Sequence, residues 1–443
     1  MMSRGETISE ADFNGVVAYL AKNFGDGGAN GAAAVSPEEK DKGFASYQTV
    51  PGQPIQVNPP NKLGEVPAFP GQTRAPYQSS DAYKLDVIND KLHTPWGLAF
   101  LPDGKFLISE RRPGALLIVD STGAKSAPLK GVEAVSRVPD FGLLDVVLDP
   151  DFANNHRIFF TFFEIITVAP GEKPTGSNTY VARATLNEAG STISDVKVIF
   201  RTVPAIPTKR LGGKTGGRIA IDPKGNLFVA IGDRDDNGVK PWAVSQQMDS
   251  DLGKIIHITP DGEPAPDNPF LGKPGVLPEI WSSGIRSPEG LAYDPQTGKL
   301  WETEHGPNGG DELNIIERGR NYGWPIIAYG IDYSGKAINN QGTQKEGMEQ
   351  PVYFWDPVIA PSGFAFYKGD LFPQWKNSAF SGGLRGKVVS RLVIANDRVV
   401  GEEALLTELD SRIRDVRVGP DGALYVLTED DGDNSRLVKL TPK

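Results

Sequence analysis

Near its C-terminus the chain contains Pro420-Asp421-Gly422-Ala423-Leu424-Tyr425-Val426-Leu427, a turn followed by a short β-rich run. Proline restricts its own φ, aspartate hydrogen-bonds to the backbone that follows it, and glycine adopts positive φ without steric cost, so the first three residues favour a tight turn. The last four residues predict a strand. The same order of turn and strand occurs at Pro102-Asp103-Gly104, Pro150-Asp151-Phe152, Pro223-Lys224-Gly225 and Pro295-Gln296-Thr297-Gly298, with a degenerate member at Pro361-Ser362-Gly363.

These six turn signals are spread along the chain from about residue 82 onward, with prolines at positions 102, 150, 223, 295, 361 and 420. Six similar all-β units in one chain predict a six-bladed β-propeller. Frequent turns between short strands also account for the 51 glycines and 36 prolines. The uneven spacing leaves a pair of β-sandwiches as an alternative, but two sandwiches give no reason for one turn signal to occur six times.

The chain before the propeller divides into two parts. Residues 1–25 contain apolar residues at helical spacing between Ser9 and Gly25, so we expect a short amphipathic helix there. Residues 26–80 are rich in Gly, Ala and Pro and are predicted to form a linker or a strap on the surface. The propeller is then expected over residues 81–443.

Two short runs in the N-terminal segment, Met1-Met2 and Ala18-Tyr19-Leu20, resemble the end of a c-type cytochrome domain. The resemblance implies that residues 1–25 are the remnant of such a domain, with haem c carried by a domain or partner outside this chain. The alternative is a plain amphipathic helix that packs on the propeller.

Composition excludes several classes of function. A net charge of −10 argues against nucleic acid or an anionic membrane as the main partner. The absence of cysteine excludes disulfides, thiolate metal sites and a cysteine nucleophile within this chain. No stretch approaches the roughly 18 apolar residues of a membrane span. The N-terminus lacks the pattern of a signal peptide, so an export signal would have to lie upstream.

Several runs across residues 85–443 occur together in one order. They are Gly142-Leu143-Leu144, Leu148-Asp149-Pro150-Asp151-Phe152, Gly217-Arg218-Ile219, Ile231-Gly232-Asp233, Gly284-Ile285-Arg286-Ser287-Pro288-Glu289-Gly290-Leu291, the run from Glu304 to Asn314, Asn321-Tyr322-Gly323-Trp324-Pro325 and Arg412-Ile413-Arg414-Asp415. In this order they resemble the soluble quinoprotein sugar dehydrogenases, the glucose/sorbosone dehydrogenase family. The resemblance implies a periplasmic or secreted enzyme that holds pyrroloquinoline quinone (PQQ) above Ca²⁺, oxidises a sugar, polyol or related alcohol or aldehyde, and passes electrons to a cytochrome c.

The resemblance also assigns site residues. The backbone carbonyls of Gly306 and Pro307 would hold calcium, a cation that prefers oxygen ligands. The cofactor would be bound by Arg286, Ser287, Arg385, Arg412, Arg414 and Asp311, since a tricarboxylate calls for fixed cationic donors. Asp233 and Trp355 would line the substrate pocket. The structural alternatives are surface or ion-pair arginines, turn residues at Asp233 and Asp311, and core packing for Tyr322 and Trp324.

The sequence departs from the family pattern at the expected base. Lys214 stands where the family has its base histidine, Asp140 stands in place of a glutamine, and Ser287 in place of an asparagine. Lys214 could act as the base if burial lowered its pKa, or Asp140 could take the proton while Lys214 holds the developing alkoxide. Condensation of the Lys214 amine with the quinone, and a shift of the alignment, are further readings. A propeller that lost the redox chemistry and serves in ligand binding or hydrolysis is the alternative function.

Overall fold

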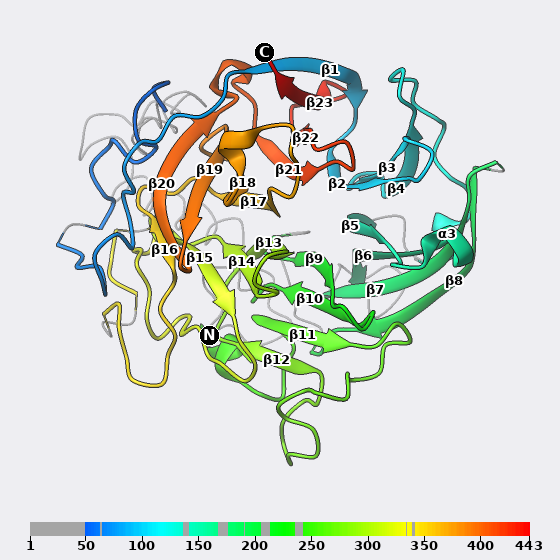
Figure 1. Cartoon of the computed structure of the whole chain (residues 1–443). Coiled ribbons are helices and arrows are strands. Elements are labelled where there is room, and N and C mark those ends of the chain that lie inside the picture. The colour runs from blue at the N-terminus through cyan, green and yellow to red at the C-terminus, as the bar shows by residue number, and fades with distance from the viewer. Residues whose placement is uncertain are drawn as a thin grey trace, which may run out of the picture. The chain divides into compact units, whose positions relative to one another are not determined.

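The computed structural model describes residues 49–62, 64–135, 141–166, 176–189, 191–204, 213–234, 242–333, 335–338 and 342–443. The expected helix in residues 1–25 and its cytochrome-like features therefore lie outside the described residues, as does Asp140. Within residues 49–443, which form one compact unit, six antiparallel sheets are arranged around a common centre (Figure 1). The six-bladed β-propeller is confirmed.

Each sheet is one blade, numbered here from the N-terminus. Blade 1 contains β2 (Pro95–Phe100), β3 (Phe106–Glu110) and β4 (Ala115–Val119). Blade 2 contains β5 (Phe141–Leu148), β6 (Arg157–Ile166), β7 (Gly176–Asn187) and β8 (Thr192–Arg201). Blade 3 contains β9 (Gly216–Ile221), β10 (Leu227–Ile231), β11 (Lys254–Ile258) and β12 (Ile280–Ser283).

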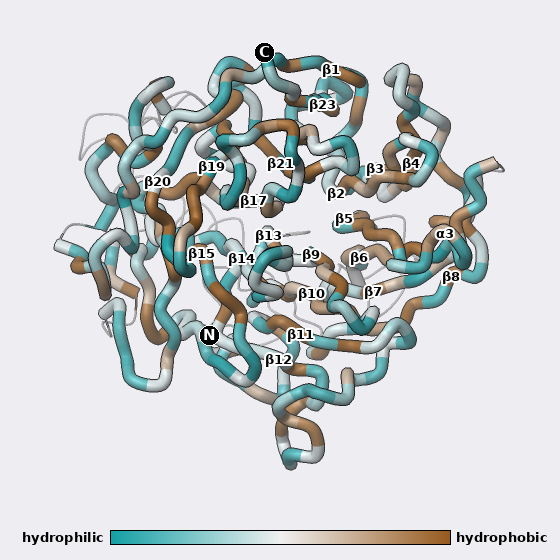
Figure 2. The backbone as a smooth tube through the Cα atoms, viewed as in Figure 1, coloured by the Kyte–Doolittle hydropathy of each residue, from teal (hydrophilic) through white to brown (hydrophobic). Residues whose placement is uncertain are grey.

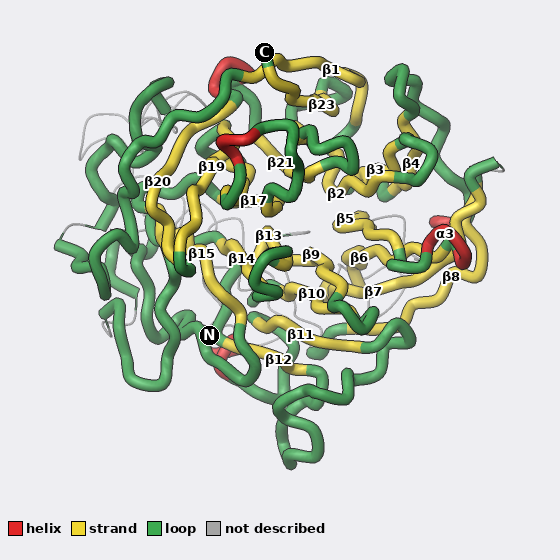
Figure 3. The backbone as a smooth tube through the Cα atoms, viewed as in Figure 1, coloured by secondary structure: helices red, strands yellow, loops and turns green. Residues whose placement is uncertain are grey.

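Blade 4 contains β13 (Pro288–Tyr293), β14 (Leu300–Glu304), β15 (Asp311–Ile316) and β16 (Tyr353–Trp355). Blade 5 contains β17 (Pro361–Phe366), β18 (Ser378–Gly383), β19 (Val388–Ala395) and β20 (Arg398–Leu405). Blade 6 contains β21 (Ile413–Val418), β22 (Leu424–Thr428), β23 (Ser435–Pro442) and, at its outer edge, β1 (Tyr83–Leu92). The described helices are short: η1 (Val132–Ala134), α3 (Phe152–Asn155), η2 (Trp242–Gln246), η3 (Pro373–Trp375) and η4 (Thr407–Leu409), all minor beside the strands in Figure 3.

Closure of the ring depends on β1, the first strand in sequence, pairing with β23, the last. The register joins Tyr83 to Pro442 and Leu85 to Leu440. Because the edge of blade 6 is completed by the beginning of the propeller segment, the two ends of residues 83–442 are held together by backbone hydrogen bonds.

Apolar packing joins neighbouring blades. One cluster combines residues of blades 1 and 2, another blades 2 and 3, and others blades 3 and 4, 5 and 6, and 6 and 1. The strands carry much of the apolar colour in Figure 2, while many connecting loops are hydrophilic. Burial of these interblade faces supplies the main driving force for the ring.

The predicted turns connect the innermost strand of a blade to the second strand. Gly104, Gly225 and Gly422 have positive φ in turns between β2 and β3, β9 and β10, and β21 and β22. In blade 2 the corresponding connection contains the short helix α3. The interpretation of residues 361–363 as a turn is wrong, because they begin the innermost strand β17 itself. A proline at the start of a strand has no preceding ladder bond to break.

The described residues between 49 and 80 contain no helix and lie against blades 4 and 5. Pro76 and Gln78 exchange backbone hydrogen bonds with Glu402, so the segment adds a short parallel bridge to β20. Ile55 and Gln72 are fully buried. The domain boundaries expected from the sequence remain a prediction. Among the described residues, we find no helix with the length and apolarity that a membrane crossing requires.

Candidate active site

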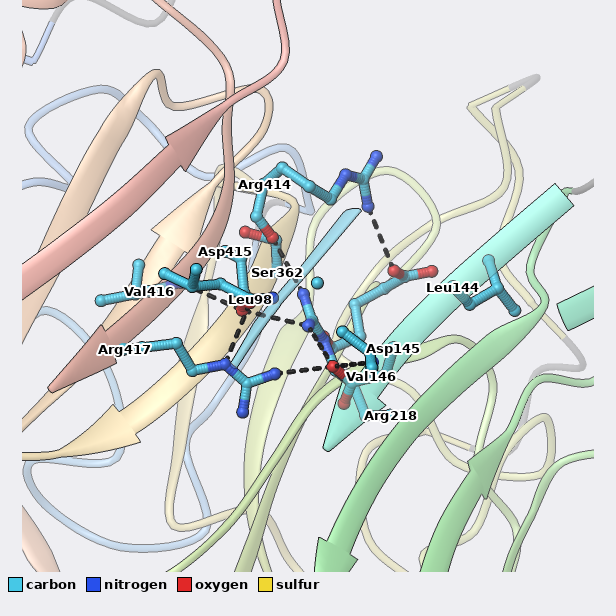
Figure 4. A network of polar contacts seen from close by, with 12 residues as sticks. Leu98, Leu144, Asp145, Val146, Arg218, Ser362, Arg414, Asp415, Val416 and Arg417 are labelled. Atoms are coloured by element: carbon cyan, nitrogen blue, oxygen red, sulfur yellow. Dashed lines mark hydrogen bonds and ion pairs between the residues drawn. The ribbon is translucent and has the colours of Figure 1, made fainter. Parts of the chain in front are cut away.

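The hub of the propeller is closed by a buried charge network (Figure 4). Arg218 of β9 is 1% exposed and lies 3.4 Å from the carboxylate of Asp145 and 3.0 Å from that of Asp415. Arg417 approaches the same two aspartates at 2.7 and 2.9 Å. Two arginines therefore face two aspartates, which neutralises charges that would be costly to bury unpaired.

The same aspartates join neighbouring blades through backbone hydrogen bonds. Asp145 of β5 accepts the N–H of Ile219 in β9, and Asp415 of β21 accepts the N–H of Leu98 in β2. The Arg218 guanidinium also donates to the backbone carbonyls of Glu289 and Arg414. The Arg218 side chain thus links three inner strands, β5, β13 and β21, to its own strand β9.

An arginine cluster lies at the N-terminal end of β21. Arg414 contacts Glu429 at 2.6 Å and Glu289 at 3.3 Å. Two further arginines lie beside the Glu429 carboxylate, Arg412 at 3.2 Å and Arg111 at 3.8 Å. Burial alone would raise the pKa of Glu429, but the three guanidinium groups outweigh it and lower the pKa to about 2. Arg412 and Arg414 thus share one partner, Glu429.

Arg286 lies at the loop expected to bind calcium. Its Nη1 donates to the carbonyls of His305 and Gly306, each at 2.8 Å, and its Cζ lies 5.1 Å from the centre of the Trp324 ring. Its Nε is buried without a hydrogen-bond partner among the described residues. A buried N–H of this kind is uncommon and marks a position where an acceptor would be stabilised.

Lys214 lies next to Asp233, with its Nζ 3.6 Å from the carboxylate. The other oxygen of Asp233 accepts the indole N–H of Trp324 at 2.8 Å, and its backbone N–H donates to Arg286. Asp233 is 1% exposed, whereas the Lys214 side chain is 16% exposed. Asp233 therefore orients the ammonium and stabilises its charged form. Trp324 takes part in this polar cluster as well as in packing.

Burial shifts the pKa of several groups beside the loop. The pKa of Glu304 rises to about 7, although the backbone N–H groups of Arg286 and Ser287 donate to it. Burial, reinforced by the charges of Arg286 and Arg414, lowers the pKa of His305 to about 3, so this imidazole is neutral at pH 7. Its Nε2 lies 2.7 Å from the carbonyl of Pro361 and must carry the proton there.

The loop expected to hold calcium can supply backbone oxygens. In the parts of the chain that the structure describes, no three His, Asp or Glu side chains are grouped as metal ligands. The carbonyls of His305 and Gly306 nevertheless converge on a cationic nitrogen of Arg286. Each of these carbonyl oxygens has a second lone pair, so the residues present fit a cation held by backbone carbonyls together with oxygens of a bound cofactor.

The other predicted site residues occupy different positions. Asp311 is 1% exposed and accepts the N–H groups of Gly306 and Ala360, so it holds the backbone of the loop. Burial raises the pKa of Asp311 to about 8. Ser287 is buried at the start of blade 4, and the backbone N–H of Arg385 donates to Ile359.

Trp355 is a buried residue of blade 4. It lies in the outer strand β16, is 0% exposed and donates its indole N–H to Glu402 at 2.7 Å. No part of the ring is exposed in this structure, and the placement of Trp355 in the substrate pocket stays a prediction.

Sequence reasoning named Arg218 and Asp415 within two family runs without assigning them a role, and it did not single out Asp145. A signal was present, because each stands five residues before the proline of its turn, at 150, 223 and 420. The same position holds Gly97 in blade 1 and Gly290 in blade 4. Comparing this one position across the turns would have shown that the hub combines arginine, aspartates and glycines.

Comparison with known proteins identifies the family of this chain. The model of the family described as Glucose / Sorbosone dehydrogenase matches residues 92–439. The chain belongs to this family. Aldose sugar dehydrogenase YliI of Escherichia coli (strain K12) is 42% identical over 360 residues, which is 81% of this chain and 93% of the relative.

Two solved structures of the family are similar throughout the propeller. The apo-form of the soluble aldose sugar dehydrogenase from Escherichia coli is 41% identical with a TM-score of 0.74, over 82% of this chain and 100% of the other. The PQQ-bound form of the aldose sugar dehydrogenase from Streptomyces coelicolor is 30% identical with a TM-score of 0.64, over 82% of this chain and 100% of the other.

Proposed function

We propose that this member of the glucose/sorbosone dehydrogenase family is a PQQ- and calcium-dependent dehydrogenase of an aldose sugar or related polyol, alcohol or aldehyde. The observation that carries the proposal is Arg286, whose Nε is buried and unpaired while its Nη1 lies between two convergent carbonyls. Membership of the family and the name of the PQQ-bound relative support the choice of cofactor.

Residues from three blades would hold the cofactor. Arg286 would turn its unpaired N–H toward a carboxylate or quinone oxygen, and Arg412 with Arg385 would add positive charge. The carbonyls of Gly306 and Pro307 would hold the calcium ion. When bound, the quinone supplies the two-electron acceptor that no side chain of this chain can provide.

Lys214 would act on the substrate as a charged group. Its ion pair with Asp233 favours the ammonium over the free amine, so it suits the stabilisation of negative charge on the substrate oxygen. Asp140 would then take the hydroxyl proton. This arrangement develops one of the readings left open by the sequence, and it needs no free amine.

The electron acceptor and the compartment are further parts of the proposal. We expect electrons to pass to a cytochrome c, on a domain or partner outside this chain, in the periplasm or outside the cell. The resemblance of residues 1–25 to the end of such a domain supports this acceptor.

Titration of the purified protein with PQQ and CaCl₂, followed by absorbance, tests the proposal directly. We expect saturable binding of one quinone that requires calcium, followed by dye-linked oxidation of aldoses. Absence of both binding and turnover would end the proposal.

The alternative, a ligand-binding or hydrolytic propeller, has Lys214 in the base position as its support. It predicts a protein that does not bind the quinone, so the same titration distinguishes the alternative from the dehydrogenase. A gain of dehydrogenase activity in Lys214→His would instead indicate an oxidoreductase that has lost its usual base.

A further inference from the structure

The N-terminal strap, defined here as residues 49–62 and 64–78, makes four hydrogen bonds with one buried acid. Asp356, 2% exposed, follows β16 and accepts the backbone N–H of Asn61 at 2.7 Å and that of Lys62 at 3.1 Å. Its own N–H donates to Gln56, and its carbonyl accepts from Arg74. Four strap residues therefore fix the backbone and side chain of Asp356.

Asp356 in turn packs against the glycine-rich loop of residues 306–310. A Cβ added to Gly309 would lie 2.7 Å from the Asp356 carboxylate, which is closer than van der Waals contact allows. The next residue, Gly310, donates its N–H to the carbonyl of Trp355 at 3.0 Å. The loop is thus held against Trp355 and Asp356, and Asp356 is the residue that the strap binds.

The strap also reaches the loop directly. The side-chain amide of Asn61 donates to the side-chain oxygen of Asn308 at 2.9 Å. Lys62 extends alongside and donates to the carbonyl of Ala328. This hydrogen bond joins two side chains 247 positions apart, so a residue that precedes the propeller contacts the middle of the loop of residues 306–310.

The loop of residues 306–310 is folded so that its first residue, Gly306, packs against its last two, Gly309 and Gly310. A Cβ at Gly306 would lie 2.2 Å from the carbonyl oxygen of Gly310 and 2.4 Å from that of Gly309. Because Gly306 packs this closely against the carbonyls of Gly309 and Gly310, we expect a displacement of residues 309–310 to shift Gly306. The family model begins only at residue 92, so the strap precedes the part of the chain that it matches.

We propose that the N-terminal strap positions the calcium loop, with Asn61 as the side chain that locks Asn308 and so sets the direction of the Gly306 carbonyl. The identity of the cation rests on the proposed function, whereas the restraint on the loop does not. Asn61 is a positioning residue and has no part in the chemistry.

Hydrogen exchange in the full chain, without quinone or calcium, tests the restraint alone. Asn61→Ala keeps the backbone bond to Asp356 but removes the amide contact, so amides of residues 308–310 should exchange about fivefold faster, as loss of one hydrogen bond predicts. Asn58→Ala is the matched control, because the contact of Asn58 with Arg74 is made by its backbone carbonyl. Unchanged exchange in Asn61→Ala, or the same change in both variants, would overturn the proposal.

Calorimetric titration with CaCl₂ then links the restraint to the site. We expect Asn61→Ala to weaken calcium binding about fivefold and Asn58→Ala to leave it unchanged. In the double variant Asn61→Ala/Asn308→Ala, the two losses should not add, because they remove one contact. If wild-type protein bound no calcium, the proposed function would fail while the exchange result still decided the role of Asn61. Calcium binding that is equal in wild type and Asn61→Ala would refute the link.

Discussion

At the scale of single residues, the chemistry of the site depends on which charge Lys214 carries. Its φ is +47°, a conformation that non-glycine residues adopt only when their surroundings hold them, and its ammonium is directed to Asp233. The carboxylate of Asp233 is fixed in turn by Trp324. This arrangement resembles that of a base with an orienting acid, but the ion pair favours a positive group over a proton acceptor.

Arginine at position 214 distinguishes these roles, because a guanidinium keeps its charge and does not lose a proton near neutral pH. We expect Lys214→Arg to retain kcat within about tenfold in dye-linked sugar oxidation, and Lys214→Ala to lose about a hundredfold or more. Lys224→Ala, at an exposed ion pair, is the control. Equal losses in the arginine and alanine variants would instead identify Lys214 as the base.

Glu429 gives a prediction on pH dependence. Its pKa of about 2 in the folded protein lies below the ordinary 4.5, so its contribution to stability is complete above pH 4.5 and is lost as the pH falls through 2. We expect Glu429→Gln to lower the free energy of unfolding by roughly 3 kcal/mol at pH 7 and by roughly half of that at pH 3. Urea denaturation at both values checks this.

The exposed Glu317, which pairs with Arg320, provides the comparison for Glu429. Glu317→Gln should change stability by less than about 1 kcal/mol. A loss for Glu429→Gln that is the same at pH 3 and pH 7 would show that lost packing, rather than lost charge, is responsible.

At the scale of elements, ring closure depends on the hydrogen bonds of one edge strand. Lys443 donates its N–H to Ala82, just beyond the paired residues of β1 and β23. Because hydrogen-bonded and non-hydrogen-bonded pairs alternate in an antiparallel ladder, Lys84 opposite Thr441 is also a hydrogen-bonded position. The exposed side chain of Lys84 contributes little packing, so its backbone N–H can be tested separately.

We expect Lys84→Pro to destabilise the protein by about 2 kcal/mol or more beyond Lys84→Ala, since proline removes a ladder donor while alanine keeps it. Thermal and urea denaturation of the two variants provide the measurement. Equal stability of the two variants would mean that closure by β1 contributes nothing to the stability of the ring.

At the scale of the whole molecule, six inner strands converge on one point, and their residues there must be complementary. A Cβ at Gly97 would lie 2.9 Å from the carboxylate of Asp145, and one at Gly363 would lie 2.1 Å from that of Asp415. Each glycine thus makes room for the aspartate of the following blade. Two long side chains, Arg218 and Arg417, each contact both acids.

Replacing Arg218 should therefore affect the entire ring. We expect Arg218→Met to lower the free energy of unfolding by about 3–5 kcal/mol, because two buried carboxylates would be left with Arg417 alone. Arg183→Met, at the partly exposed pair with Asp261, should cost less than about 1 kcal/mol. A similar cost for the two substitutions in urea denaturation would show that the hub network does not stabilise the fold.

The sequence by itself determined the class of fold and the number of blades. Turn chemistry such as Pro102-Asp103-Gly104 is local, so it can be read without knowing what lies nearby in space. The order of motifs likewise identified the family and the loop around Gly306, and it singled out Lys214 and Asp233, which the structure brings within 3.6 Å.

Only the tertiary structure decided the partners of the charged groups. Asp145 and Arg417 are 272 positions apart, and Asn61 and Asn308 are 247 apart, so their contacts exist only once the ring has closed. The same holds for Trp355, whose buried indole donates to Glu402, 47 positions further along the chain. Burial and charge pairing are properties of the assembled blades, whereas turn formation depends on a few adjacent residues.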